Sequence, residues 1–186
     1  MSKLVYVENH NNCESVLFVE EGYELTKQLD EADLLCLEGG ADITPALYGE
    51  ENTSSHNRVR LDIHSLGLLQ FAVMTGIPVV GICRGAQLLH AYHGGKLKQH
   101  VNGHQGNHIT TQPYGPPISV NSVHHQAMID FSGCQVLGKA EDGILEITAY
   151  DMNHLGYQSH PEWMSFGSPS REIFFRLVED YCFGGK

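Results

Sequence analysis

The segment Gly81-Ile-Cys83-Arg-Gly85 places one thiol between two glycines, each two residues away. It follows the strand-like run 77–82 and precedes 84–92, which has the composition of a helix. Glycines at these positions relieve the crowding of a sharp strand-turn-helix bend, which lifts the central side chain out of the sheet. Because a helix N-terminus favours a thiolate over a thiol, we expect Cys83 to be a nucleophile that attacks a carbonyl carbon.

A thiolate nucleophile needs a base that manages protons. His160 and Glu162 follow a predicted strand and are separated by Pro161, so their side chains point the same way. The carboxylate of Glu162 can then orient the imidazole of His160 by a hydrogen bond. We predict His160 as the general base and Glu162 as its orienting partner.

The attacked carbonyl also needs donors for the oxyanion that forms. The backbone N–H of Arg84, directly after the nucleophile, is one candidate. The turn Gly39-Gly40, which ends a neighbouring strand, provides another, and the sequence does not distinguish its two N–H groups. All these groups lie at C-terminal ends of strands, where sites form in open α/β sheets.

The remaining cysteines and the histidines receive no chemical role from their spacing. The other four thiols are predicted to be small buried hydrophobes, without disulfides; they are Cys13, Cys36, Cys134 and Cys182. Five histidines could suggest a metal centre, but no compact pattern with acidic or cysteine ligands joins them; they are His100, His104, His108, His124 and His125. We therefore expect hydrogen-bonded or solvated histidines, no metal site and no cofactor.

Short apolar runs alternate with helical stretches along the chain, which predicts βαβ units around a largely parallel sheet. Strands are expected at 4–7, 33–37, 77–82, 144–150 and 155–159, and helices at about 14–21, 62–75, 84–92 and 170–181. The segment 99–117 is rich in Gly, His, Asn, Gln and Pro and is expected to be an exposed connection. With 186 residues, the chain is expected to form a single domain over 1–186.

Composition narrows the function classes. The chain carries 11 basic and 22 acidic residues, a formal net charge of -11, without a basic cluster, so nucleic acid and anionic membranes are poor candidate partners. No secretory signal pattern and no membrane-spanning apolar run is present in the sequence, and we expect a cytoplasmic protein.

Four motifs together resemble the class I glutamine amidotransferase-like superfamily, and within it most closely the γ-glutamyl hydrolase branch, peptidase family C26. They are Leu37-Glu-Gly-Gly-Ala-Asp-Ile-Thr-Pro-Ala-Leu-Tyr-Gly49, Gly81-Ile-Cys-Arg-Gly-Ala-Gln-Leu-Leu89, Asn121-Ser-Val-His-His-Gln126 and His160-Pro-Glu-Trp163.

The resemblance implies a flavodoxin-like three-layer sandwich with a mostly parallel central sheet and a Cys83, His160 and Glu162 triad. It also implies a covalent γ-glutamyl thioester that water resolves. Gln87 matches a position that helps to hold the glutamyl group, and His124 and His125 match another wall of that pocket. Ser159 replaces a bulkier residue that commonly precedes the histidine, which would widen the floor of the site.

Three functions follow as hypotheses. The first is a stand-alone hydrolase that cleaves the γ-amide of a small γ-glutamyl compound and releases glutamate and an amine. The second is a glutaminase subunit that supplies ammonia to a separate synthetase partner. The third is a binding module that keeps the fold without catalysis.

Overall fold

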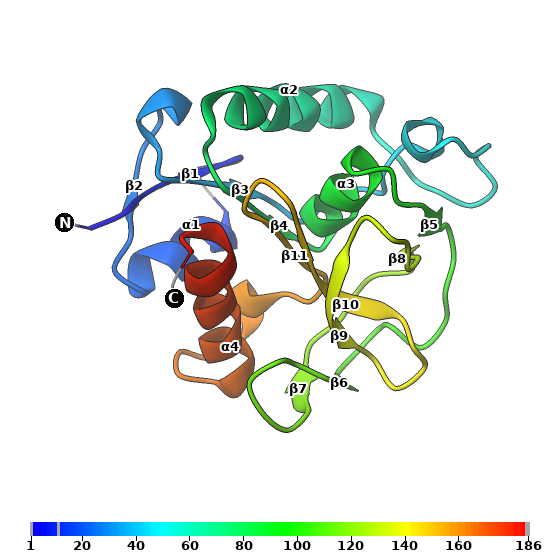
Figure 1. The fold of residues 1–186 in the computed structure, drawn as a ribbon. Helices are drawn as coiled ribbons and strands as arrows, with labels where there is room; N and C mark the ends of the chain where they lie inside the picture. Colours follow the sequence, from blue (N-terminus) through cyan, green and yellow to red (C-terminus); the bar gives the residue numbers. More distant parts are fainter. Residues whose placement is uncertain (1, 11, 185–186) are drawn as a thin grey trace.

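The computed structural model describes residues 2–10 and 12–184 and contains one large mixed sheet with helices on both faces (Figure 1). The strands are β1 (Leu4–Val7), β2 (Glu24–Leu25), β3 (Leu34–Leu37), β4 (Val79–Ile82), β5 (Leu97–Lys98), β6 (His108–Thr110), β7 (Ile118–Val120), β8 (Ala127–Met128), β9 (Gln135–Lys139), β10 (Leu145–Tyr150) and β11 (His154–Tyr157). The α-helices are α1 (Cys13–Glu20), α2 (Val59–Thr75), α3 (Arg84–Tyr92) and α4 (Pro169–Leu177).

The strand order of the large sheet is β2-β1-β3-β4-β11-β10-β8-β5, with β9 also paired to β10. The pairs from β2 to β11 are parallel, whereas β11 pairs with β10 in the antiparallel sense. The carboxyl ends of β3 and β4 therefore lie at the same edge, next to the end of β11. This edge carries the three motifs that supply the candidate chemistry.

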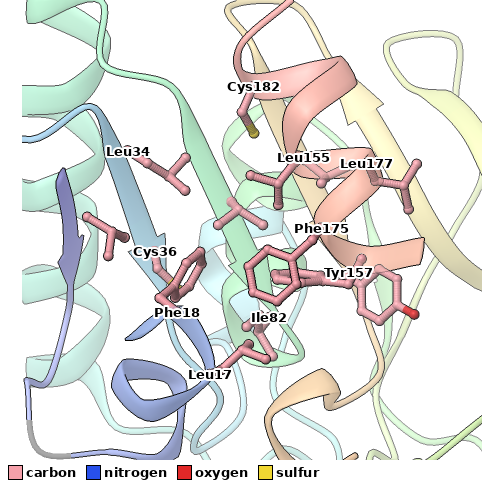
Figure 2. Close-up of a cluster of buried hydrophobic side chains, with 14 of the residues drawn as sticks. Leu17, Phe18, Leu34, Cys36, Ile82, Leu155, Tyr157, Phe175, Leu177 and Cys182 are labelled. Carbon is pink, nitrogen blue, oxygen red and sulfur yellow. The ribbon is translucent and has the colours of Figure 1, made fainter. Parts of the chain in front are cut away.

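Two separate apolar cores hold the layers together. On one face, α1 and α4 cover the sheet, and Figure 2 shows side chains of both helices, including Phe18 and Phe175, packed over Cys36 and Ile82. On the other face, α2 and α3 pack Leu69 and other apolar side chains against alternate residues of β3 and β4. Because strand side chains alternate between faces, each buried strand serves both cores. The α/β sandwich predicted from the sequence is confirmed.

The segment 99–117 differs from the exposed connection that its composition predicts. It contains β6, which forms a hairpin with β7, and His104 and Thr110 within it are buried. Polar residues can be buried here because other polar groups meet them, which composition alone does not reveal. The predicted C-terminal helix is also divided, since α4 ends at Leu177 and a π-helical turn covers Val178–Cys182.

Two further observations concern the described residues as a group. No helix in 2–10 and 12–184 combines the length and apolar character that crossing a membrane requires. The five cysteines are free thiols; Cys36 and Cys182 are buried, Cys134 is partly buried, and Cys13, which was predicted to be buried, is exposed because it is the first residue of α1.

Candidate active site

Cys83 occupies a strained bend between β4 and α3. Its φ angle is 49°, a left-handed conformation that is unfavourable for a residue with a side chain. The flanking glycines make the bend possible: a Cβ at Gly81 would lie 2.3 Å from the carbonyl carbon of Gly85. A Cβ at Gly85 would lie 2.2 Å from the carbonyl oxygen of Leu37. The predicted elbow is therefore present, and both glycines are required by backbone contacts.

The turn after β3 lies beside the elbow. The N–H of Gly85 donates to the carbonyl of Glu38 at 3.0 Å, which fixes the turn against the start of α3. Gly39 packs so closely against the ring of His160 that a Cβ would lie 3.3 Å from its Cε1 atom. The two glycine N–H groups differ, because that of Gly39 donates to Glu14 Oε1 at 3.3 Å. Within the described chain, the N–H of Gly40 has no such acceptor.

His160 follows β11 and is held from three sides. Its Nδ1 atom lies 2.5 Å from Oε1 of Glu162, and its backbone N–H donates to Oδ1 of Asn121 at 3.0 Å. The imidazole is stacked on the indole of Trp163, with ring centroids 4.0 Å apart and planes 5° from parallel. Its Nε2 atom has no hydrogen-bond partner among the described residues, which leaves this nitrogen free for proton transfer.

The surroundings of His160 favour its charged form. Burial alone would lower the pKa of this imidazole, but the Cys83 thiol and the Glu162 carboxylate together raise the pKa to about 10. The imidazole is therefore protonated at neutral pH. An imidazolium next to a thiol stabilises the thiolate, the form that attacks carbonyls.

Cys83, His160 and Glu162 line one cavity of about 500 Å³. Five other residues of this cavity carried no predicted role; they are Asn12, Cys13, Glu14, Val123 and Trp163. Burial and the neighbouring Glu162 carboxylate raise the pKa of Glu14 above its usual range. No sequence pattern pointed to Asn12 and Glu14, because they lie at the start of α1, far along the chain from every motif.

The side chains of the three predicted substrate-binding residues do not reach this cavity. Gln87 is buried and its Nε2 donates to Oε1 of Gln158 at 3.2 Å. His124 points to Glu146, with 3.5 Å from Nε2 to Oε1, and His125 lies 2.9 Å from Asp42. The segment 121–126 still borders the cavity, but through Val123 and through the Asn121 contact to His160.

The Arg84 and Ser159 side chains also point away from the cavity. Arg84 is 1% exposed and its guanidinium donates to Asp62 at 2.6 Å and to Ser65 at 2.9 Å. Its backbone N–H remains at the start of α3, where an oxyanion donor is expected. Ser159 is 1% exposed and donates to Glu146 at 3.3 Å, so its small size does not widen the floor of the cavity.

The histidines include a cluster that the sequence interpretation did not join. An acidic residue does unite three of them: Oε1 of Glu146 lies 3.2–3.5 Å from a ring nitrogen of each. The three are His104, His108 and His124. They were expected to be solvated or separately hydrogen-bonded because Glu146 lies far away in the sequence, on β10. The antiparallel extension of the sheet brings these segments together.

The sandwich, the Cys83 elbow and the His160–Glu162 pair at one sheet edge define a protein of the class I glutamine amidotransferase-like superfamily. The family model described as Peptidase C26 matches residues 6–116. The chain belongs to this family.

Relatives and solved structures agree with this assignment. The chain is 30% identical to the glutamine amidotransferase-like protein YvdE of Lactococcus lactis, over 79% of this chain and 73% of that protein. It is 28% identical to the gamma-glutamyl-gamma-aminobutyrate hydrolase of Escherichia coli O157:H7, over 85% and 75%. A glutamine amidotransferase from Thermotoga maritima shares the fold, with a TM-score of 0.67 and 16% identity over 96% of this chain and 83% of that one. The chain spans 52% of a relative from Mycobacterium tuberculosis and 62% of one from Schizosaccharomyces pombe.

Proposed function

We propose that this protein hydrolyses the γ-amide bond of a small γ-glutamyl compound through a thioester on Cys83. The observation that carries the proposal is that Cys83 and the His160–Glu162 pair line the same cavity. The relative named gamma-glutamyl-gamma-aminobutyrate hydrolase supports a γ-glutamyl amide as the substrate class.

The reaction begins with a thiolate–imidazolium pair. The Cys83 sulfur attacks the γ-carbonyl carbon, the carbon–nitrogen bond breaks, and the leaving amine takes the proton from Nε2 of His160. Water then attacks the thioester and gives a proton to the now neutral imidazole, and the sulfur–carbon bond breaks to release glutamate. Glu162 holds the imidazole in position in both steps through its contact to Nδ1.

In the proposed mechanism, two backbone N–H groups stabilise the oxyanion. Arg84 supplies the one directly after the nucleophile, and Gly40 supplies the one from the turn after β3. Gly40 is favoured over Gly39 because the N–H of Gly39 already donates to Glu14. Donors that are fixed before the reaction lower the barrier without reorganisation.

Glu14 suits the α-ammonium of the glutamyl group. Its carboxylate is buried, lines the cavity and has no basic side chain as a hydrogen-bond partner in the described chain. A bound cation next to this carboxylate would offset the desolvation that raises its pKa. Replacing Glu14 with Gln should therefore raise KM more than it lowers kcat.

The test is glutamate release from a panel of γ-glutamyl amines and from L-glutamine, with the Cys83→Ala variant as the matched control. Fast Cys83-dependent release from γ-glutamyl amines, with little from glutamine, supports the proposal. Equal release by Cys83→Ala would contradict the mechanism. Release mainly from glutamine, stimulated by an added synthetase, would identify an ammonia-donating subunit instead.

A further inference from the structure

A buried cluster separate from the Cys83 cavity brings three imidazoles to one carboxylate. We propose that His104, His124 and Glu146 bind a divalent transition-metal ion, best zinc, with His108 as the fourth ligand. We call these four residues the His-Glu cluster. They come from the segment before β6, from β6 itself, from the segment before β8 and from β10.

The distances from Glu146 to the three imidazoles match those between neighbouring ligands of one metal ion. Three ring nitrogens lie 3.4, 3.2 and 3.5 Å from Oε1 of Glu146; they are Nδ1 of His104, Nε2 of His108 and Nε2 of His124. With metal–ligand bonds of about 2.0–2.2 Å, the ligand atoms of a tetrahedral zinc ion lie about 3.3–3.6 Å apart. The ligand atoms of His104, His124 and Glu146 are also all within 4.8 Å of one another. His108 does not belong to this close group, so its ring would move inward when the ion binds.

The converging atoms have no other partners. Within the described residues, each of the three nitrogens and Oε1 of Glu146 is buried and lacks a hydrogen bond of acceptable geometry. Four unpartnered polar atoms in one buried place are costly. A metal ion among His104, His124 and Glu146 would satisfy three of these atoms, and an inward movement of His108 would satisfy the fourth.

The opposite ring nitrogens are oriented as in known metal sites. Nε2 of His104 lies 3.0 Å from Asp142, and Nδ1 of His124 lies 2.8 Å from the carbonyl of Gln126. Metal-binding histidines nearly always make such contacts to a carboxylate or a carbonyl, which fix the ring and its tautomer. Glu146 is likewise held, because its second oxygen accepts from Ser159.

An ion can reach the His-Glu cluster from solvent. A cavity of about 180 Å³ at the surface is lined by His104, His108 and Asp142, among others. His108 is the partly exposed member of the cluster, with 16% of its side chain accessible. The three buried ligands therefore form the base of the site, and His108 closes it.

The competing interpretation is an ion pair without metal. In that case, the contact to Glu146 raises the pKa of His104 to about 9, against the effect of burial and together with Asp142, and a protonated imidazole neutralises the carboxylate. Zinc binding separates the two interpretations, because a protonated imidazole cannot bind the ion.

The experiment uses a Cys83→Ser background, so that the active-site thiol cannot bind zinc. After removal of metal by a chelator and dialysis, zinc binding is titrated by calorimetry, and cobalt(II) is added separately to read its visible absorption. One zinc per chain and the intense bands of tetrahedral cobalt are expected. Substitution of Glu146→Gln or His124→Ala should weaken zinc binding at least about 100-fold, and Asp142→Asn about 10-fold.

The matched control is His64→Ala, which removes an exposed imidazole on α2 and should leave zinc binding unchanged. The Asp142→Asn variant is expected to fold normally, because the Asp142 side chain is 53% exposed and the substitution keeps its shape. Weaker zinc binding by this variant therefore cannot be attributed to misfolding. No zinc binding by the parent protein, or equal binding by the His124→Ala and His64→Ala variants, would overturn the proposal. Neither outcome depends on the γ-glutamyl hydrolase activity.

Discussion

The Nδ1 atom of His160 lies 2.5 Å from Oε1 of Glu162, and Trp163 stacks on the same imidazole. Two residues of the turn that follows His160 thus fix its ring on two sides. The third side is open at Nε2, toward the cavity that contains Cys83.

Substitution of Glu162→Gln should lower kcat on the order of 100-fold or more with little effect on the fold. The amide can still contact the ring, but it no longer stabilises an imidazolium, and it can offer its NH₂ to Nδ1 and select the wrong tautomer. Kinetics on the preferred γ-glutamyl amide, with Glu172→Gln on the exposed face of α4 as control, measures the effect. An unchanged kcat would show that Glu162 does not act on the base.

The single tryptophan of the chain, Trp163, should report the charge of His160. A protonated imidazole quenches the fluorescence of an indole that it contacts, whereas a neutral one quenches much less. Because the pKa of His160 is raised from 6.5 to about 10, emission should stay low through neutral pH and rise as pH passes 10. The same shift contributes stability that is fully present below pH 6.5 and is lost as pH rises through 10.

A fluorescence titration from pH 5 to 11 checks this prediction. His160→Gln is the control, since it keeps the indole but removes the titrating group; its emission should be higher at neutral pH and lack this rise. Tyrosine ionisation would affect both proteins alike. A rise near pH 6.5 in the parent protein would mean that Cys83 and Glu162 do not raise the pKa of His160.

Local patterns predicted the elbow and the His160–Glu162 pair because each depends on only a few residues that are close together in the sequence. Glycines two positions on either side of Cys83 indicate a bend, and His160 and Glu162 are only two residues apart. The positions of the longer strands follow from short apolar runs. Such features need no knowledge of which strands are neighbours.

The His-Glu cluster and the Glu14 contact could not be predicted in this way. Glu146 faces His104 and His124 only because β10 pairs with β8 and β9 in the antiparallel sense. Glu14 reaches Gly39 only because α1 covers the edge where β3 ends. These contacts depend on strand order and helix placement. Two-residue strands such as β2, β5 and β8 are too short to show a periodic apolar pattern, so the sequence does not predict where they pair.

Substitution of Gly85→Ala should prevent a stable fold or lower the free energy of unfolding by about 2 kcal/mol or more. The added Cβ would lie 2.2 Å from the carbonyl oxygen of Leu37, and backbone atoms cannot move aside cheaply. Gly67 is the matched control, because it lies on the exposed face of α2 with nothing within 4 Å of a Cβ. Gly67→Ala should stabilise by about 0.5–1 kcal/mol through helix propensity.

Urea unfolding followed by circular dichroism compares the two glycine variants. The change in the free energy of unfolding is expected to have opposite signs for the two Gly→Ala substitutions, because backbone atoms crowd position 85 whereas position 67 is open. Equal effects would mean that the close approach of α3 to the end of β3 is not maintained in solution.

Asp62→Asn should lower the free energy of unfolding by about 3 kcal/mol. The carboxylate of Asp62 accepts from the Arg84 guanidinium at 2.6 Å, and the two side chains are 3% and 1% exposed. Removing the negative charge leaves a buried guanidinium uncompensated next to the start of α3. Because Arg84 directly follows the nucleophile, Asp62→Asn should also reduce kcat.

The control for this pair is Asp130→Asn, which removes the partner of Lys139 at 3.1 Å. These side chains are 57% and 41% exposed, so solvent screens the interaction and the expected change is about 0.5 kcal/mol or less. Denaturant unfolding of both variants gives the comparison. If the two substitutions lower the free energy of unfolding equally, the Arg84–Asp62 pair is as hydrated as a surface pair. The elbow is then held by the backbone contacts of Gly81 and Gly85 and not by this pair.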